Sequence, residues 1–237
     1  LARHPRFEVL VIEQDRAPRL QGPFPHPNCR HVFTYNPGPF NKSWGFNVGF
    51  RLSEQAWFAF GDADLIVGNA IDEALSHLRG GYQAAKPYRR LLDLDGDESR
   101  RVRAGEFDWL PPRENGALRN REGIGEHIVM AGGLIGLART AFVRLGGWDE
   151  RFRGWGGEDD AMSYKLERLR LPAVELDRRP AVHLQHARTP ETTLQQPHYA
   201  ANRALLADYA RLSDAELARL AEVQMQVIGH REKYRPQ

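Results

Sequence analysis

The sequence predicts an α/β protein, a sandwich of helices around a mostly parallel central sheet. Short apolar runs alternate along the chain with segments whose apolar residues recur at helical spacing. This alternation is typical of βαβ units. The length of 237 residues suffices for one well-buried domain. We therefore expect a single domain over residues 1–237.

The predicted strands are apolar runs bounded by turn residues. Residues 9–12 read Val-Leu-Val-Ile, and residues 56–60 read Ala-Trp-Phe-Ala-Phe before an abrupt change to Gly61 and Asp62. The full set of predicted strands is 7–13, 31–35, 56–60, 131–137, 173–176 and 181–186.

The predicted helices rest on spacing and on capping residues. Apolar side chains fall on one face of 41–52, at Trp44, Val48 and Leu52. Thr140 suits an N-cap, and Ser213 with Glu216 fits a capping box. The predicted helices are 41–52, 69–78, 140–145, 158–169 and 213–227, the last within a helical tail over 197–237. Residues 92–126 are charged and contain Gly and Pro, which predicts an irregular segment that is functional or mobile.

Composition limits the partners and the compartment. The formal net charge is only +2 and the basic residues are spread along the chain, which argues against nucleic acid as a partner. Cys29 is the only cysteine, as is typical of a reducing compartment. No run is apolar over the length of a membrane-spanning helix. We expect a cytoplasmic protein, peripheral to the inner membrane in a bacterium, or a Golgi-lumenal one if the chain is a trimmed eukaryotic sequence.

Two motifs could supply metal ligands. Asp62-Ala63-Asp64 follows a predicted strand, at the sheet edge where ligands collect in open α/β sheets. Carboxylates so close together can bind Mn²⁺ or Mg²⁺. His183 and His186 end a later strand and could complete such a site. The competing interpretations are an exposed Asp-rich turn and structural histidines.

The acidic loop, Gly154–Asp160, combines one Trp and three glycines with three adjacent carboxylates. Such carboxylates repel one another and gain little in a core, whereas glycines let a ligand approach the backbone. A carboxylate in a water-poor pocket can act as a general base. Helix capping is the competing interpretation, but it leaves Trp155 and the glycines unexplained. The loop predicts a site for a hydroxylated, phosphorylated ligand.

With these motifs in this order, the chain resembles the β-1,4-galactosyltransferase family and its bacterial relatives among GT-A glycosyltransferases. The blocks that carry the resemblance are Val11–Gln14, Phe40–Lys42, Asn47–Phe50, Asp62–Asp64, Gly132-Gly133, Gly146–Trp148, Trp155–Asp160 and His183–His186. The family's first strand would precede Leu1. The resemblance therefore implies a GT-A, Rossmann-like fold that lacks this strand in the present sequence.

The resemblance also implies roles for individual residues. The metal ligands would be Asp64, His183 and His186. The donor-binding residues would be Gln14, Phe40, Lys42, Asp62, Gly133, Trp155 and Glu158. Trp155 and Asp160 would contact the acceptor, and Asp159 would be the catalytic base. Lys42 stands where the family has Arg, which puts a bidentate phosphate contact in doubt.

The implied activity is a metal-dependent, inverting transfer of a hexose or N-acetylhexosamine from a UDP-sugar to a hydroxyl of a glycan or glycoconjugate, as in polysaccharide biosynthesis. The implied cofactor is Mn²⁺ or Mg²⁺, and residues 92–126 would lie on the acceptor side. Two other interpretations remain open. A metal-dependent sugar-nucleotide hydrolase or nucleotidyltransferase would need no acceptor. A catalytically silent carbohydrate-binding domain would not bind UDP with Mn²⁺.

Overall fold

The computed structural model describes residues 6–22, 24, 26–112, 129–187 and 196–234. By its internal contacts the chain divides into two compact parts. The first part comprises Leu1–Glu54, Val143–Ala161 and Thr189–Gln237, and the second part comprises Gln55–Phe142 and Met162–Arg188.

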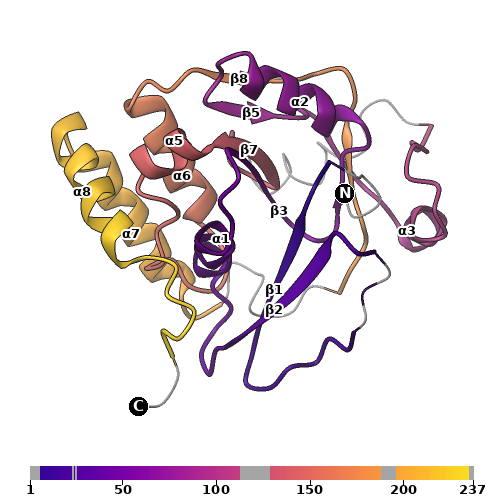
Figure 1. Cartoon of the computed structure of the whole chain (residues 1–237), viewed down its shortest axis with the longest axis horizontal. Coiled ribbons are helices and arrows are strands. Elements are labelled where there is room, and N and C mark those ends of the chain that lie inside the picture. The colour runs from indigo at the N-terminus through magenta and orange to yellow at the C-terminus, as the bar shows by residue number, and fades with distance from the viewer. Residues whose placement is uncertain (1–5, 23, 25, 113–128, 188–195, 235–237) are drawn as a thin grey trace. The chain divides into compact units, whose positions relative to one another are not determined.

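The first part begins with two parallel strands, β1 (Val9–Asp15) and β2 (Cys29–Tyr35), which lie side by side in Figure 1. Helix α1 (Lys42–Arg51) follows them. Its N-cap is Asn41, whose side chain accepts the backbone N–H of Trp44 at 2.8 Å. Trp44 is fully buried, so the apolar face that predicts this helix is also the face that it buries.

Two C-terminal helices, α7 (Tyr199–Arg211) and α8 (Asp214–Val227), belong to the same part (Figure 1). The predicted capping box is present, since the Ser213 hydroxyl accepts the Glu216 N–H and Glu216 accepts the Ser213 N–H. The buried Tyr209 hydroxyl of α7 accepts from Gln224 of α8 at 3.2 Å and so joins the two helices.

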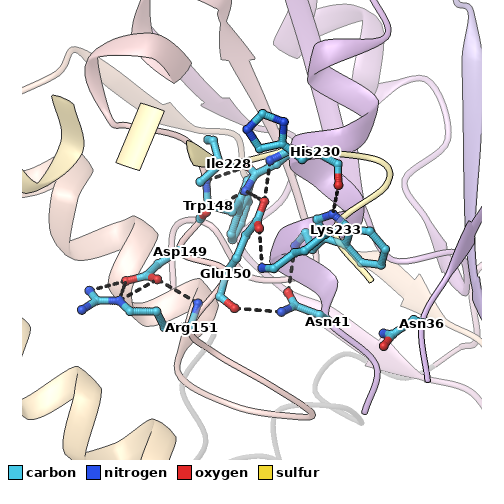
Figure 2. Close-up of polar contacts among 12 residues, drawn as sticks. Asn36, Asn41, Trp148, Asp149, Glu150, Arg151, Ile228, His230 and Lys233 are labelled. Carbon is cyan, nitrogen blue, oxygen red and sulfur yellow. Dashed lines mark hydrogen bonds and ion pairs between the residues drawn. The ribbon is translucent and has the colours of Figure 1, made fainter. Parts of the chain in front are cut away.

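A network around buried Glu150 ties the chain after α8 to the rest of the first part (Figure 2). One carboxylate oxygen of Glu150 accepts from the Asn47 amide and from the Gly229 N–H, at 2.9 and 2.6 Å. The other is 2.7 Å from Nζ of Lys233. Because each oxygen has a partner, the burial of this charge is compensated. We call Gly229–Lys233 the C-terminal clasp.

The second part contains two sheets. One has the strand order β3-β7-β5-β8 and the other has the order β4-β9-β6. Their bounds are β3 Trp57–Gly61, β4 Leu65–Ile66, β5 Ala84–Lys86, β6 Leu91–Asp93, β7 Leu134–Ala138, β8 Ala173–Glu175 and β9 Ala181–His183.

Helices from the same part pack on these sheets. Helix α2 (Ala70–Arg79) buries Ala74 and Leu78 in a cluster with Ala85 of β5. Helix α3 (Gly96–Arg103) buries Val102 in a cluster with strand residues of the smaller sheet. The described residues also form the helices α5 (Arg139–Arg144) and α6 (Glu158–Arg168). Among the described residues, no helix is both long and apolar enough to cross a membrane.

The α/β prediction is confirmed, but a mostly parallel sheet is not. Among the described strands, three pairings are parallel and three are antiparallel. An apolar run identifies a buried strand without fixing its direction, which explains the difference. The segment 92–126, expected to be irregular, contains α3, while its residues 113–126 lie outside the described residues.

Candidate functional site

Asp64, His183 and His186 form a cluster in the second part. One possible ligand atom from each residue lies within 4.8 Å of the other two. Oδ2 of Asp64 is 3.4 Å from Nε2 of His183 and 3.3 Å from Nε2 of His186. The structure thus brings together the three residues that the sequence predicts as metal ligands.

The smaller sheet positions this cluster. In its middle strand, β9, His183 is aligned with Leu65 of β4 on one side and with Asp93 of β6 on the other. The Leu184 N–H donates to the backbone carbonyl of Asp64 at 2.9 Å. Backbone pairing therefore sets His183 between two carboxylates, one on each neighbouring segment.

Hydrogen bonds at the Nδ1 atoms orient both imidazole rings. Nδ1 of His183 is 3.0 Å from Oδ1 of Asp93, and Nδ1 of His186 is 3.0 Å from the carbonyl oxygen of Ala187. An ionised carboxylate and a carbonyl only accept, so each Nδ1 carries a hydrogen. When either ring is neutral, its Nε2 therefore carries a lone pair that is available to a metal, and both Nε2 atoms lie within 3.4 Å of Oδ2 of Asp64.

The charges in the cluster perturb its proton affinities. Hydrogen bonds to Asp64 and then to Asp93 raise the pKa of His183 to about 9, although burial acts in the opposite direction. Burial alone would raise the pKa of Asp64, but the hydrogen bond from His183 and the charges of both histidines outweigh it and lower this pKa. The cluster therefore favours positive charge at its centre.

The chemistry of the donors fits Mn²⁺. Imidazole nitrogen suits transition metals, and carboxylate oxygen suits Mn²⁺ and Mg²⁺. The mixed set formed by Asp64, His183 and His186 therefore favours Mn²⁺ over Mg²⁺, which prefers oxygen alone. Three protein ligands would leave coordination positions for oxygen atoms of a substrate.

A glycine turn precedes β7 in the same part. Gly61, the last residue of β3, lies opposite Leu134, and the Asp62 N–H donates to the Gly133 carbonyl at 2.9 Å. Gly133 has a φ of +76°, and a Cβ there would overlap the hydroxyl of Tyr88. Glycine is therefore required at this position. The predicted donor residues Asp62 and Gly133 are direct neighbours.

Two buried side chains hold this turn. Nζ of Lys86 donates to the carbonyls of Val129 and Gly132, at 2.6 and 2.8 Å, and the Tyr88 hydroxyl donates to the same Gly132 carbonyl at 2.9 Å. Lys86 and Tyr88 are at most 1% exposed. A buried ammonium is compensated here by oriented carbonyl dipoles.

The acidic loop lies in the first part, and its glycines are conformationally required. Gly154, Gly156 and Gly157 have φ values of +66°, +99° and +95°. A Cβ at Gly157 would also come within 2.7 Å of the ring of Phe152. The loop is therefore a shaped turn that only glycine can adopt. It ends at α6, whose first turn contains Glu158, Asp159 and Asp160.

Lys42 pairs with the acids of this loop. Its Nζ is 3.0 Å from Oδ2 of Asp159 and 3.7 Å from Oε1 of Glu158. The three side chains are only 9–21% exposed. The start of α1 and the start of α6 thus supply four residues with predicted donor, acceptor or catalytic roles. They are Lys42, Glu158, Asp159 and the half-buried Asp160.

The other predicted donor residues of the first part differ in accessibility. The Gln14 amide is engaged by the chain itself, since it accepts the Asn41 N–H at 3.0 Å and donates to the Asn41 carbonyl at 2.7 Å. Phe40 is 56% exposed. Trp155 is half-buried and stacks on Tyr199 with ring centroids 5.9 Å apart. Phe40 and Trp155 therefore offer aromatic surface, whereas Gln14 caps the turn into α1.

Sequence reasoning did not identify Asp93, Lys86 or Tyr88. Each lies on or beside a strand of three residues, too short to show a pattern. The available signal was a lone charged residue at the end of an apolar run, in Ala84-Ala85-Lys86 and Leu91-Leu92-Asp93.

Comparisons of sequence identify relatives for part of the chain. A family model described as the N-terminal domain of galactosyltransferase matches residues 127–189. β-1,4-Galactosyltransferase 5 of Danio rerio is 26% identical over 131 residues, which are 54% of this chain and 27% of the relative. N-acetylgalactosaminyltransferase 7 of Rattus norvegicus is 35% identical over 87 residues, 33% of this chain and 13% of the relative. The chain thus spans about a quarter or less of the length of these relatives.

Two solved structures of Drosophila β-1,4-galactosyltransferase 7 are also similar. The catalytic domain in complex with xylobiose matches with a TM-score of 0.44 and 15% identity, over 67% of this chain and 58% of that one. A mutant in complex with manganese, UDP-Gal and xylobiose matches with a TM-score of 0.45 and 15% identity, over 66% and 56%.

The segment matched by the family model contains Gly133, the acidic loop, His183 and His186. The resemblance inferred from the order of the motifs is therefore confirmed there: in sequence, this chain is galactosyltransferase-like.

Proposed function

We propose that the chain belongs to a metal-dependent GT-A glycosyltransferase that moves a hexose or N-acetylhexosamine from a UDP-sugar to a hydroxyl of a glycan or glycoconjugate, with inversion. The observation that carries this proposal is the convergence of Asp64, His183 and His186 on one point. Support comes from the galactosyltransferase model that matches residues 127–189. The single domain, the compartment and the lack of nucleic-acid partners stay predictions.

Asp64, His183 and His186 would hold Mn²⁺. When bound, the ion would supply Lewis-acid stabilisation of the negative charge that develops on the departing UDP diphosphate. Asp93 holds the ring of His183 in the orientation that directs Nε2 at Asp64. Asp62 and Gly133 would contact the donor beside this site.

Asp159 would act as the general base in a single displacement. Its carboxylate takes the proton of the acceptor hydroxyl as that oxygen bonds to the anomeric carbon, while the bond from this carbon to the UDP oxygen breaks. Glu158 would bind donor-sugar hydroxyls, and Asp160 would orient the acceptor. The exposed ring of Phe40 and the half-buried ring of Trp155 would cover the nucleotide and sugar, and exclusion of water there would limit donor hydrolysis.

The first test of this function is ligand binding and turnover. We expect calorimetry to detect binding of Mn²⁺ by the chain, and binding of UDP that depends on Mn²⁺. We expect a screen of UDP-sugars with glycan acceptors to detect transfer of the sugar. Asp159→Asn should bind Mn²⁺ and UDP as wild type does, and should lose about 10²–10⁴-fold in transfer rate, the range for removal of a general base.

Asp64→Asn should lose Mn²⁺ binding. Asp177→Asn should retain it, because Asp177 is an exposed carboxylate that pairs with Arg90 in the same part.

Release of free sugar or pyrophosphate at the same rate with and without an acceptor would argue for a hydrolase or nucleotidyltransferase. Near-normal transfer by Asp159→Asn would remove Asp159 from the role of base.

A further inference from the structure

Two carboxylates and an aromatic ring surround the ammonium group of Lys42. Besides Asp159 at 3.0 Å and Glu158 at 3.7 Å, its ammonium lies 5.7 Å from the centre of the Phe46 ring. Phe46 is one turn further along α1 and packs on Trp148 with centroids 5.1 Å apart. A lysine that is mostly buried between two carboxylates and an aromatic face has lost the freedom of a surface lysine.

The two residues before Lys42 are hydrogen-bonded to the chain at Glu150 and Gly154, shortly before Glu158 and Asp159. The Gly154 N–H donates to the Phe40 carbonyl at 2.8 Å, and the Asn41 amide donates to the Glu150 carbonyl at 2.8 Å (Figure 2). Contacts of the two residues that precede Lys42 thus hold the start of α1 against Glu150 and against the first residue of the acidic loop. The ion pair of Lys42 and Asp159 adds a contact between two side chains to this set.

We propose that Lys42 is a positioning residue for Asp159, and that its ammonium fixes one oxygen of that carboxylate so that the other faces the acceptor hydroxyl. This inference rests on the proposed function, because it gives Asp159 the role of base. It differs from the contact with the nucleotide that the resemblance implies for Lys42.

Two physical arguments favour this role. An ammonium at 3.0 Å forms a charge-assisted hydrogen bond, which restricts the rotation of a short carboxylate side chain. Proton transfer in the transition state is sensitive to such placement, and a misplacement of about 1 Å can lower a rate about 10²-fold. A contact with phosphate alone would instead change donor affinity and the rate together.

The experiment compares Lys42→Met, Lys42→Arg, Asp159→Asn and the double variant Lys42→Met/Asp159→Asn. For each, kcat and the KM for donor and acceptor are measured, with UDP affinity in Mn²⁺ by calorimetry. We expect Lys42→Met to lower kcat about 10–100-fold with UDP affinity within about threefold of wild type. Lys42→Arg, which keeps a donor to the carboxylate, should recover most of this loss.

The double variant gives the sharpest result. If Lys42 acts through Asp159, adding Lys42→Met to Asp159→Asn should lower kcat no further, because residues that act as a unit are not additive. Lys233→Met is the matched control, since Lys233 also pairs with a buried carboxylate of the first part, at 2.7 Å from Glu150. It should lower thermal stability and leave kcat near wild type.

Several outcomes would overturn the inference. A Lys42→Met variant with normal kcat and weaker UDP binding would make Lys42 a nucleotide contact. Multiplication of the two single effects in the double variant would separate Lys42 from Asp159. Absence of transfer by the wild-type chain would instead overturn the proposed function, and the role of Lys42 with it.

Discussion

At the scale of single residues, the orientation of His183 depends on a side chain that would not itself touch a metal. Asp93 contacts Nδ1 of His183 at 3.0 Å, on the side of the ring away from Asp64. It contributes a fixed ring orientation and extra basicity at Nε2. The same arrangement makes the metal site depend on the pairing of β6 with β9.

Replacement of Asp93 by Asn should therefore weaken Mn²⁺ binding without unfolding the chain. We expect affinity to fall about 10–100-fold, the range for loss of such a partner, with the circular dichroism spectrum unchanged. Calorimetric titration with Mn²⁺ measures the effect. Asp177→Asn serves again as the exposed control. Equal affinities in wild type and Asp93→Asn would show that Asp93 does not support the site.

Residues of the candidate site show a signal in the sequence where they belong to a motif, and they show none where they act on its members. Asp64 and the two histidines were predicted because carboxylates and imidazoles at strand ends have a recognisable chemistry. Asp93 and Lys86 lie in separate strands and reach the site only through pairing and packing. Pairing between distant strands leaves no local pattern in a single sequence.

At the scale of elements, the structure depends on glycines with left-handed backbone conformation. Gly146 follows α5 with a φ of +69°, and a Cβ there would overlap the backbone carbonyl of Ala221 in α8. The turn at Gly146 and helix α8, both in the first part, thus approach each other at a point where there is no room for a methyl group.

Gly146→Ala should lower the free energy of unfolding by about 2–4 kcal/mol, as the sum of backbone strain and overpacking. Gly81→Ala is the matched control, because Gly81 also has a positive φ, +106°, but a methyl group there would have no other atom within 4 Å. The free energy of unfolding of Gly81→Ala should fall by only about 1 kcal/mol. Urea titration of both variants measures the difference, and equal losses would contradict the overlap at Ala221.

Long elements with strong patterns were predicted well, and short ones were not. The helices α1, α2 and α8 match their predicted ranges within two residues. Strands β4 and β5, of two and three residues, had no signal of their own. Helix α3 was missed because its mean composition is polar, although Asp95 and Glu98 form a capping box. Tertiary packing of Val102 stabilises it.

At the scale of the whole molecule, stability should depend on pH through Asp149. This buried carboxylate accepts from Arg151 and from the Tyr209 hydroxyl, both at 2.6 Å to Oδ2 (Arg151 is shown in Figure 2). Burial alone would raise its pKa, but the hydrogen bonds from Arg151 and Tyr209 outweigh burial and lower the pKa of Asp149.

A carboxylate with a lowered pKa stabilises the folded state above its unfolded pKa of about 4 and loses this contribution as the pH falls further. The free energy of unfolding of Asp149→Asn should therefore be about 1–3 kcal/mol below that of wild type at pH 7. This difference between the two proteins should become smaller below pH 4. Urea unfolding between pH 3 and 7 measures the free energy of unfolding of both proteins. A difference that stays constant down to pH 3 would contradict the lowered pKa of Asp149.

The C-terminal clasp has a consequence for the order in which the protein can be completed during synthesis. Glu150 precedes the acidic loop by only a few residues, yet its partners Gly229 and Lys233 lie 79 and 83 residues later in the sequence. The indole of Trp44 reaches the His230 carbonyl across 186 residues. Contacts of such long range require the closure of a long loop before they can form. A nascent chain that has not yet extended past Lys233 therefore has the acidic loop in its sequence but not the partners of Glu150, and the buried charge of Glu150 is compensated only once residues 229–233 have been made.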